Sequence, residues 1–238
     1  MHPVLNDTSL CAIVRDEKMN PAGGIASFIE SHIHFVEEAV IVDTGSVDGT
    51  RELLEKTSLC YPNLRVYDRN FDGYASSRNF ALDQVQTKRA LVLDADELLT
   101  REDFEKLSVI LKEKRSLCYG FNFVHVYTDI AKSCLGSYCN PRLFDISPFI
   151  RYRRELWEIL YFGDIPSFHS HDIIFPTGIS IKHFLAYQEA CLIKDQEWYT
   201  CFQYKKEGIF FKKPLPSPSK LPSFAQWKQF NPQRNEYS

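Results

Sequence analysis

Short apolar runs that alternate with helical segments constrain the fold of this chain most strongly. The runs SLCAIV (9–14), AVIV (39–42) and ALVL (90–93) are apolar at nearly every position. This pattern is typical of strands that are covered on both faces in a parallel sheet. Helical patterns lie at 23–35, 48–57 and 74–85, and a further strand is expected at 63–69. The alternation of strand and helix predicts an α/β fold with helices on both faces of a mostly parallel central sheet.

The second half of the chain has a more mixed pattern. A helix is expected at 101–114, and period-two or short strands are expected at 118–129, 140–146 and 178–184. A second helical pattern covers 187–206. We expect one large domain over 1–213, divided into halves at 9–99 and 100–213, the second half being partly antiparallel. The Pro- and Ser-rich segment 214–238 is expected to be a tail.

Composition excludes several classes of function. The net charge of the 238 residues is −3, which leaves no basic surface for nucleic acid. The seven cysteines form no C-x-x-C pair, which argues against a zinc knuckle and a disulfide framework. No stretch is long and apolar enough for a signal peptide or a membrane span, so a soluble, cytoplasmic protein is expected, and peripheral association with a membrane remains compatible with the sequence. The oligomeric state is not predicted.

A cluster of carboxylates follows the apolar run that ends at Leu93. Asp94, Asp96 and Glu97 stand where parallel strands commonly present a ligand site. In an extended chain the Asp-X-Asp (DXD) spacing turns both Asp side chains to one side, where they repel unless a cation lies between them. A divalent metal with oxygen ligands satisfies this need. The alternative is a polar turn before the helix that Thr100 and Asp103 would cap.

The segment VIVDTGSVDGT (40–50) places a second carboxylate at a strand end. Asp43 is followed by a Gly45-Ser46 turn, which would keep bulky side chains away from a flat ligand. Such a carboxylate accepts hydrogen bonds from an imide N–H or from ribose hydroxyls. The alternative is an ordinary turn between strand and helix. Neither a G-x-x-x-x-G-K-[ST] phosphate loop nor a G-x-G-x-x-G fingerprint is present, so ATPase and dehydrogenase functions lose their main support.

Several segments together resemble the family 2 glycosyltransferases of the GT-A fold. SLCAIVRDEK, AVIVDTGSVDGT, YASSRN and LVLDADELL occur in the order and spacing seen in the nucleotide-binding half of that family. PRLFDISPFIRYRRELWEIL and ISIKHFLAY resemble its Arg-Leu-Phe, "vHE" and "HxGY" segments. The chain departs from the family at Trp157, where many relatives have His, and at 184–186, where an aromatic-Gly pair is usual. These departures concern the acceptor more than the donor.

The resemblance implies a metal-dependent, inverting transfer of a sugar from a nucleoside-diphosphate sugar, expected to be UDP-linked, to a hydroxyl of a glycan or glycolipid. Residues 9–99 would bind the nucleotide and 100–213 the acceptor. The implied donor-binding residues are Asp43, Arg15, Glu17, Arg78 and Asp94. The implied metal ligands for Mn²⁺ or Mg²⁺ are Asp96 and His183, with Asp94 bound directly or through water.

An inverting transfer also requires a general base on the acceptor side. Glu158 is preferred because it aligns without a gap with the Glu of the "vHE" segment, while Glu155 and Asp164 are the other candidates. An exposed position on an amphipathic element is the alternative for Glu158. Arg151, Arg153 and Arg154 would bind a phosphate or an anionic acceptor, or would form a solvated strand face.

Two other functions stay open at this point. One is a nucleotide-sugar or carbohydrate-binding module that keeps the fold without transfer activity, since fold alone does not fix function. The other is a nucleotidyltransferase, which is disfavoured because VRDEKMNPAGG (14–24) lacks the glycine-rich, lysine-containing loop expected of that class.

Overall fold

A computed structural model describes residues 3–127, 132–137, 139–154, 158–170 and 172–185. The strands are β1 (Leu5–Val14), β2 (Val36–Asp43), β3 (Leu64–Asp68), β4 (Arg89–Val92), β5 (Glu97–Leu98), β6 (Cys118–Tyr127), β7 (Lys132–Leu135), β8 (Asn140–Asp145), β9 (Ile150–Arg153), β10 (Ile159–Phe162), β11 (Ile165–Pro166) and β12 (Ile174–Leu185). The helices are α1 (Ile25–His32), α2 (Thr50–Ser58), α3 (Tyr74–Asp83), α4 (Arg101–Glu113) and the short 3₁₀ helix η1 (Ser167–His169). The helix predicted at 187–206 and the tail 214–238 lie outside the described residues.

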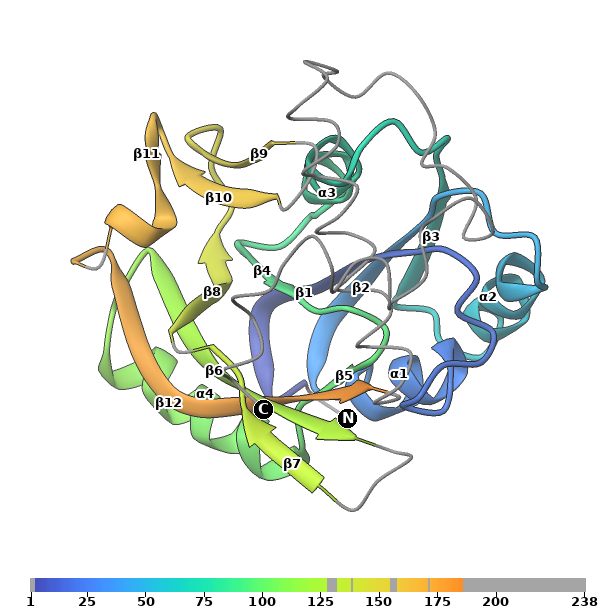
Figure 1. The fold of residues 1–238 in the computed structure, drawn as a ribbon, viewed down its shortest axis with the longest axis horizontal. Helices are drawn as coiled ribbons and strands as arrows, with labels where there is room; N and C mark the ends of the chain where they lie inside the picture. The colour runs from blue at the N-terminus through green and yellow to red at the C-terminus, as the bar shows by residue number, and fades with distance from the viewer. Residues whose placement is uncertain (1–2, 128–131, 138, 155–157, 171, 186–238) are drawn as a thin grey trace, which may run out of the picture. The chain divides into compact units, whose positions relative to one another are not determined.

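The main sheet has the order β3-β2-β1-β4-β8-β6-β12-β5, with β7 paired to β6 (Figure 1). β1, β2, β3 and β4 run parallel, as the alternation of strand and helix predicts. β8 pairs antiparallel with both β4 and β6, whereas β6 and β12 pair in parallel. The mixed second half predicted from the sequence is therefore confirmed, and the antiparallel strand joins it directly to the first half.

Two apolar cores, one on each face of the sheet, explain the all-apolar strands. Successive residues of β2 alternate between them: Ile41 packs in the core that contains Phe28 of α1, and Val42 packs in the core that contains Leu82 of α3. Each strand residue thus removes its side chain from water on one face or the other. Because β1, β2, β3 and β4 run parallel, their carboxyl ends lie at one edge of the sheet.

The carboxylate cluster lies next to helix α4, whose start was predicted from the sequence, and includes strand β5, which was not predicted. Thr100 caps α4 as predicted: its hydroxyl accepts from the backbone N–H of Asp103, and the Asp103 carboxylate accepts from the backbone N–H of Thr100. The sequence did not predict β5, whose two residues pair with β12. A strand this short has no periodicity of its own, and its partner lies far along the chain.

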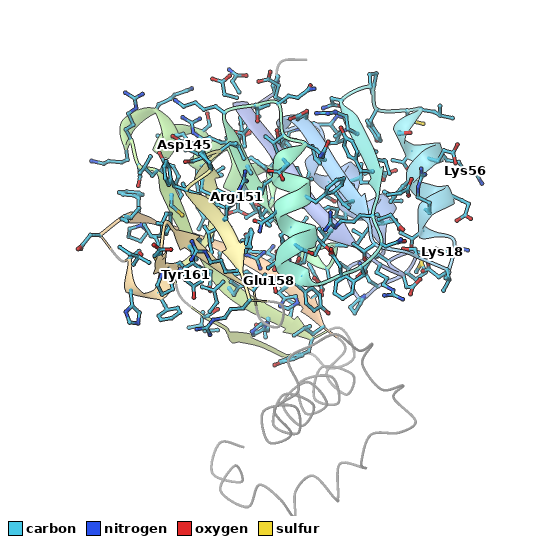
Figure 2. The ribbon with its side chains drawn as sticks, turned by 90° about the horizontal axis from the view of Figure 1, so that it is seen from above. Lys18, Lys56, Asp145, Arg151, Glu158 and Tyr161 are labelled. Atoms are coloured by element: carbon cyan, nitrogen blue, oxygen red, sulfur yellow. The ribbon has the colours of Figure 1, made fainter. Side chains whose placement is uncertain are left out.

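A separate three-stranded sheet, β11-β10-β9, lies beside α3. The Asn79 side chain bridges α3 to β9, since it donates to the Tyr152 carbonyl and accepts from the Tyr152 N–H, both at 2.9 Å. Arg151, which is labelled beside α3 in Figure 2, adds an ion pair to Asp83 of that helix at 2.8 Å. These contacts fix the small sheet against the first half of the chain. Among the helices of the described residues, none is long and apolar enough to span a membrane.

Candidate functional site

Asp43 stands at the carboxyl end of β2, as predicted, and is almost fully buried. Its Oδ1 accepts from the backbone N–H groups of Gly45 and Ser46, each at 2.9 Å. Its Oδ2 is buried and has no hydrogen-bond partner among the described residues. Gly45 has a φ of 104°, and a Cβ atom there would meet open space. The turn therefore leaves one buried carboxylate oxygen without a partner, two residues before a glycine that faces open space.

The segment after β1 packs against this turn. The N–H of Asp16 donates to Ser46 Oγ at 2.9 Å, and the N–H of Val47 donates to Asp16 Oδ1 at 2.7 Å. Arg15, one of the predicted donor-binding residues, is exposed and lies 3.9 Å from Asp16. The loop conformation is thus held by backbone contacts that leave the Arg15 guanidinium accessible to solvent.

Glu17 links the same loop to the carboxylate cluster. Asn20 donates to Glu17 Oε2 at 2.9 Å and to the Ala95 carbonyl at 3.0 Å, so a single amide bridges the two segments. Burial raises the pKa of Glu17 above its ordinary value, and the nearby charges of Asp96 and Asp94 raise it further, although the Asn20 hydrogen bond opposes them. The structure therefore brings Glu17 near the predicted metal ligands.

The carboxylate cluster forms a turn and not an extended strand. The chain turns at Ala95 and Asp96, and the Glu97 N–H donates to the Asp94 carbonyl at 2.9 Å. The extended backbone on which the Asp-X-Asp argument depended is therefore not formed here, so the alternation of side-chain directions does not apply. Asp94 and Asp96 have different partners.

Two arginines balance the charge of the cluster. Asp94 accepts hydrogen bonds from Arg78 and, at 3.5 Å, from Arg142, which also donates to Glu97 at 2.7 Å. Burial alone would raise the pKa of Asp94, but the two guanidinium groups hold it well below its usual value. Burial raises the pKa of Glu97 to about 7. The guanidinium groups thus neutralise part of the negative charge that the sequence analysis expected a metal ion to neutralise.

Arg142 was missed as a site residue. It lies on β8, stacks over the Phe123 ring at 4.9 Å and reaches the Val92 carbonyl at 3.4 Å. The Arg-Leu-Phe segment was recognised in the sequence, but only the antiparallel pairing of β8 with β4 brings its arginine to the carboxylates of the first half. That pairing joins strands far apart in the chain, so local sequence patterns did not reveal it.

Asp96 points to the other predicted metal ligand. His183 Nε2 lies 3.1 Å from Asp96 Oδ2, and the Phe184 N–H donates to the Asp96 carbonyl at 2.9 Å. The β5–β12 pairing, which sets His183 opposite Glu97, produces this contact. Burial lowers the pKa of His183, but the bond to Asp96 and the neighbouring acidic charges outweigh it and raise the pKa above its ordinary value.

The Asp96–His183 pair fits a metal ion that is shared with a ligand. One carboxylate and one imidazole are ligands that Mn²⁺ accepts, and Mg²⁺ uses few protein ligands together with water and phosphate oxygens. Within the described residues, no group of three or more His, Cys, Asp or Glu side chains forms a complete metal site. Two protein ligands would leave the other positions around such an ion to donors from outside this pair.

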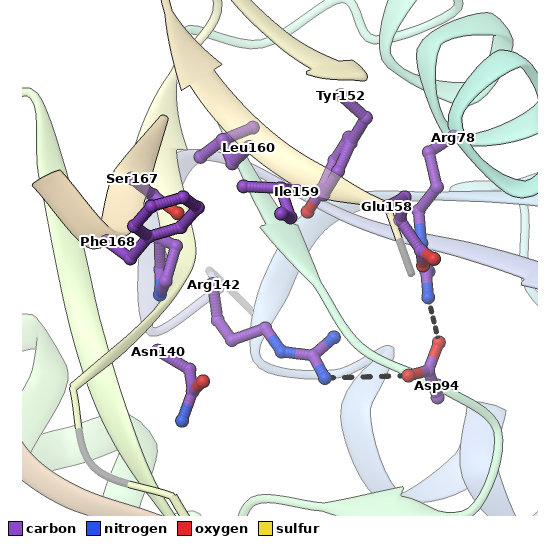
Figure 3. A pocket seen from close by; sticks show the side chains of 11 residues that line it. Arg78, Asp94, Asn140, Arg142, Tyr152, Glu158, Ile159, Leu160, Ser167 and Phe168 are labelled. Carbon is purple, nitrogen blue, oxygen red and sulfur yellow. Dashed lines mark hydrogen bonds and ion pairs between the residues drawn. The ribbon is translucent and has the colours of Figure 1, made fainter. Parts of the chain in front are cut away.

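A cavity of about 320 Å³ lies beside Asp94, which forms part of its lining (Figure 3). Arg78 lies in its wall and donates to Glu158 Oε1 at 3.1 Å, while its buried Nη1 has no hydrogen-bond partner among the described residues. The full lining is Arg78, Asp94, Asn140, Pro141, Arg142, Tyr152, Glu158, Ile159, Leu160, Ser167 and Phe168. The predicted base Glu158 thus shares a cavity with the predicted donor-binding residues Arg78 and Asp94.

The other candidates on the acceptor side lie differently. Asp164 is almost fully exposed, pairs with Arg153 at 3.0 Å and is not part of the cavity lining. Arg151 and Arg153 each pair with an acidic residue, so the solvated and structural interpretation of these arginines fits better than a phosphate site. Glu155 and Trp157 lie outside the described residues.

The sequence of the chain is similar to those of known glycosyltransferases. The family described as glycosyl transferase family 2 matches residues 20–159. The chain is 33% identical over 93 residues to a protein of Bacillus subtilis (strain 168) described as a teichuronic acid biosynthesis glycosyltransferase, TuaG. That match covers 39% of this chain and 36% of the relative, so this chain spans little more than a third of the relative's length.

Two solved structures share the fold. The mannosyltransferase PcManGT of Pyrobaculum calidifontis, solved with GDP-Man and Mn²⁺, has a TM-score of 0.51 at 14% identity, over 90% of this chain and 67% of its own. TarS of S. aureus has a TM-score of 0.50 at 13% identity, over 80% of this chain and 42% of its own. Such likenesses establish the architecture, which is the GT-A fold predicted from the sequence.

Proposed function

The chain belongs to glycosyl transferase family 2, and on this basis we propose that it transfers a sugar from a nucleoside-diphosphate sugar to a hydroxyl group of a glycan or glycolipid. The observation that carries the proposal is that Asp94, Arg78 and Glu158 line the same cavity, while Asp96, two residues after Asp94, contacts His183. We further propose that residues 9–99 bind the nucleotide and that the acceptor half extends to 213, followed by the tail 214–238.

Asp43 would bind the nucleoside. Its unpaired Oδ2 is a buried acceptor, and a buried acceptor without a donor is costly. An imide N–H of uracil or a ribose hydroxyl would satisfy it, while Gly45 would let the flat base approach the backbone. The Arg15 guanidinium and the Glu17 carboxylate border the same turn and would complete the nucleoside site.

Asp96 and His183 would hold Mn²⁺ or Mg²⁺ against the diphosphate. When bound, the ion would act as a Lewis acid that stabilises the leaving nucleoside diphosphate. Arg78 would add to this from the protein side, because it lines the cavity with a positive charge and its buried Nη1 has no hydrogen-bond partner among the described residues. Asp94, held by Arg78 and Arg142, is fixed in direction and charged, as contact with ribose hydroxyls or with a metal-bound water requires.

Glu158 would be the general base of an inverting transfer. A carboxylate has two oxygens, and Arg78 holds one of them, Oε1, at 3.1 Å, which orients the other for an acceptor hydroxyl. Proton removal from that hydroxyl would then accompany its attack on the sugar. Glu158 comes from the second half of the chain, the half proposed to bind the acceptor, and its contact with Arg78 brings it next to the proposed donor site.

The ion pair between Arg78 and Glu158 is also the observation that favours the alternative, a nucleotide-sugar-binding module without transfer activity. A base whose charge is fully satisfied by an arginine would bind ligand without deprotonating it. One experiment separates the two functions. UDP-linked and GDP-linked hexoses are incubated with the protein and Mn²⁺, and the release of free nucleoside diphosphate is measured without an acceptor.

A transferase is expected to hydrolyse its own donor slowly, and EDTA is expected to stop the reaction. A binding module would show saturable nucleotide binding by calorimetry and no release above the rate without protein. Glu158→Gln provides the matched control, since it keeps the shape of the side chain and removes the proton acceptor. Absence of both binding and release with every donor would contradict the proposed function.

A further inference from the structure

Phe168 has an unusual position for a large apolar side chain. It lines the cavity that contains Glu158 and Arg142, yet 48% of its surface is exposed. The neighbouring apolar lining residue Leu160 is only 2% exposed. A large aromatic ring left accessible in the wall of a cavity is a common mark of a ligand contact, because its burial is completed only when the ligand binds.

The turn that carries Phe168 is well defined. Residues Ser167–His169 form η1, the Ser170 N–H donates to the Ser167 carbonyl at 3.0 Å, and the Ser170 hydroxyl donates to the Pro166 carbonyl at 3.0 Å. The Phe168 ring meets the His169 ring edge to face at 4.5 Å. These contacts fix the ring before a ligand arrives, so little conformational entropy is lost on binding.

The cavity presents a different chemistry on each side. Figure 3 shows Phe168 and Asp94 at opposite sides of the cavity, with Arg142 between them. The wall near Phe168 also contains the neutral polar side chains of Asn140 and Ser167 and the apolar side chain of Ile159. The opposite wall contains the charged side chains of Arg78, Asp94 and Glu158. A ligand with one apolar face and a rim of hydroxyl groups matches the Phe168 side, and a sugar ring has this character.

Phe168 lies away from the residues that are proposed to bind the donor. Asp43 and the Asp96–His183 pair belong to the nucleotide side, and Asp94 joins them at the edge of the cavity. Phe168 lies across the cavity from Asp94, and it comes from the second half of the chain. A ring stacked on Phe168 would approach Glu158 from the side away from the diphosphate, which is the side of the attacking hydroxyl.

We propose that Phe168 recognises the acceptor, by stacking on the apolar face of its terminal sugar ring while Asn140 and Ser167 hydrogen-bond to ring hydroxyls. This inference rests on the proposed function for the roles of donor and base. The binding of the sugar itself rests on the cavity alone. The hydrogens on the apolar face of a sugar carry partial positive charge, which is attracted to the negative face of an aromatic ring.

The test uses methyl glycosides of glucose, galactose, mannose and N-acetylglucosamine as probes. Saturation-transfer NMR on the full chain measures their binding without a donor, and the acceleration of nucleoside diphosphate release measures their use as acceptors. Phe168→Ala is expected to raise the KM for the accelerating glycoside roughly fivefold to tenfold, with kcat and acceptor-free donor hydrolysis within about twofold of the wild type. Phe168→Trp is expected to restore the wild-type KM.

Phe149→Ala is the matched control, because Phe149 is 73% exposed and does not line the cavity. It is expected to leave both readouts unchanged. Equal glycoside KM or NMR binding in Phe168→Ala and the wild type would overturn the inference, as would the absence of binding by every glycoside. The two proposals can also fail separately. If the wild type hydrolyses no donor but binds a glycoside, and Phe168→Ala loses that binding, the inference about Phe168 is supported and the proposed transfer is contradicted.

Discussion

At the scale of single residues, the site consists of carboxylates whose neighbours differ. Asp94 is bound by two arginines, Asp96 by a histidine, and Asp43 by two backbone N–H groups on one oxygen alone. Their environments therefore assign different tasks to side chains of the same type. Asp96 and Asp43 each lead to a prediction.

Asp96→Asn is expected to lower metal-dependent donor turnover at least about a hundredfold while the fold stays intact. An amide binds Mn²⁺ far less well than a carboxylate, and the diphosphate would then lose the charge that offsets its own repulsion. Turnover at a series of Mn²⁺ concentrations measures the effect. Asp164→Asn removes one carboxylate from an exposed ion pair and serves as control. Wild-type turnover by Asp96→Asn, or turnover that resists EDTA, would refute the metal assignment.

Asp43→Asn is expected to weaken UDP binding by about 1.5–3 kcal/mol, the usual value of a hydrogen bond to a charged group. Asparagine keeps an oxygen for the N–H groups of Gly45 and Ser46, so the turn should be preserved. Calorimetry with free UDP and with the intact donor should show the same loss, because the nucleoside is common to both. An unchanged affinity for both would remove Asp43 from the nucleoside site.

At the scale of elements, the strands and helices of the first half could be predicted from the sequence. Which of these elements come together to form the site could be predicted only in part. The apolar runs predicted β1, β2 and β4 because each strand carries its own burial pattern. The β8–β4 and β5–β12 pairings depend on contacts between distant segments, which no local period encodes. Asp43 and Asp96 were named because they follow apolar runs, and His183 was named from the family resemblance alone, whereas nothing local marked Arg142 as a neighbour of the carboxylates.

The cap of α4 provides a prediction at this scale. Thr100→Ala is expected to lower the free energy of unfolding by about 1 kcal/mol, because it removes the hydroxyl that accepts from the Asp103 N–H. Urea denaturation measures the loss. Ser108→Ala, inside the same helix, is the control and should be neutral or slightly stabilising. A loss of equal size in both variants would show that the capping box does not stabilise the fold.

At the scale of the whole molecule, the fold buries a histidine that has no part in the proposed site. His32 is fully buried; its Nδ1 lies 2.6 Å from the Phe28 carbonyl, and its Nε2 accepts from the Leu99 N–H at 3.2 Å. These contacts satisfy the neutral ring with the proton on Nδ1. Burial lowers the pKa of His32 to about 4, despite the opposing effect of the Phe28 carbonyl.

Linkage then fixes the sign of the pH dependence. The imidazole of His32 binds a proton near pH 6.5 in the unfolded chain but only near pH 4 in the folded protein. The contribution of His32 to the free energy of unfolding is therefore complete above pH 6.5 and is lost as the pH falls toward 4. Glu97 acts in the opposite direction, since its raised pKa favours the folded state at low pH and this contribution is lost as the pH rises through about 7. A comparison of variants is needed to separate the two groups.

His32→Gln isolates the histidine, because glutamine is neutral at every pH and leaves Glu97 in place. The variant should be less stable than the wild type at pH 7.5, and its deficit should shrink by about 2 kcal/mol at pH 5, where the wild type has lost most of the His32 contribution. Urea denaturation at the two pH values measures both deficits. His34→Gln, a change at an exposed neighbouring histidine, should show no such difference. A His32→Gln deficit that is independent of pH would mean that His32 titrates alike in the folded and unfolded chain, and that the buried hydrogen bonds do not hold it neutral.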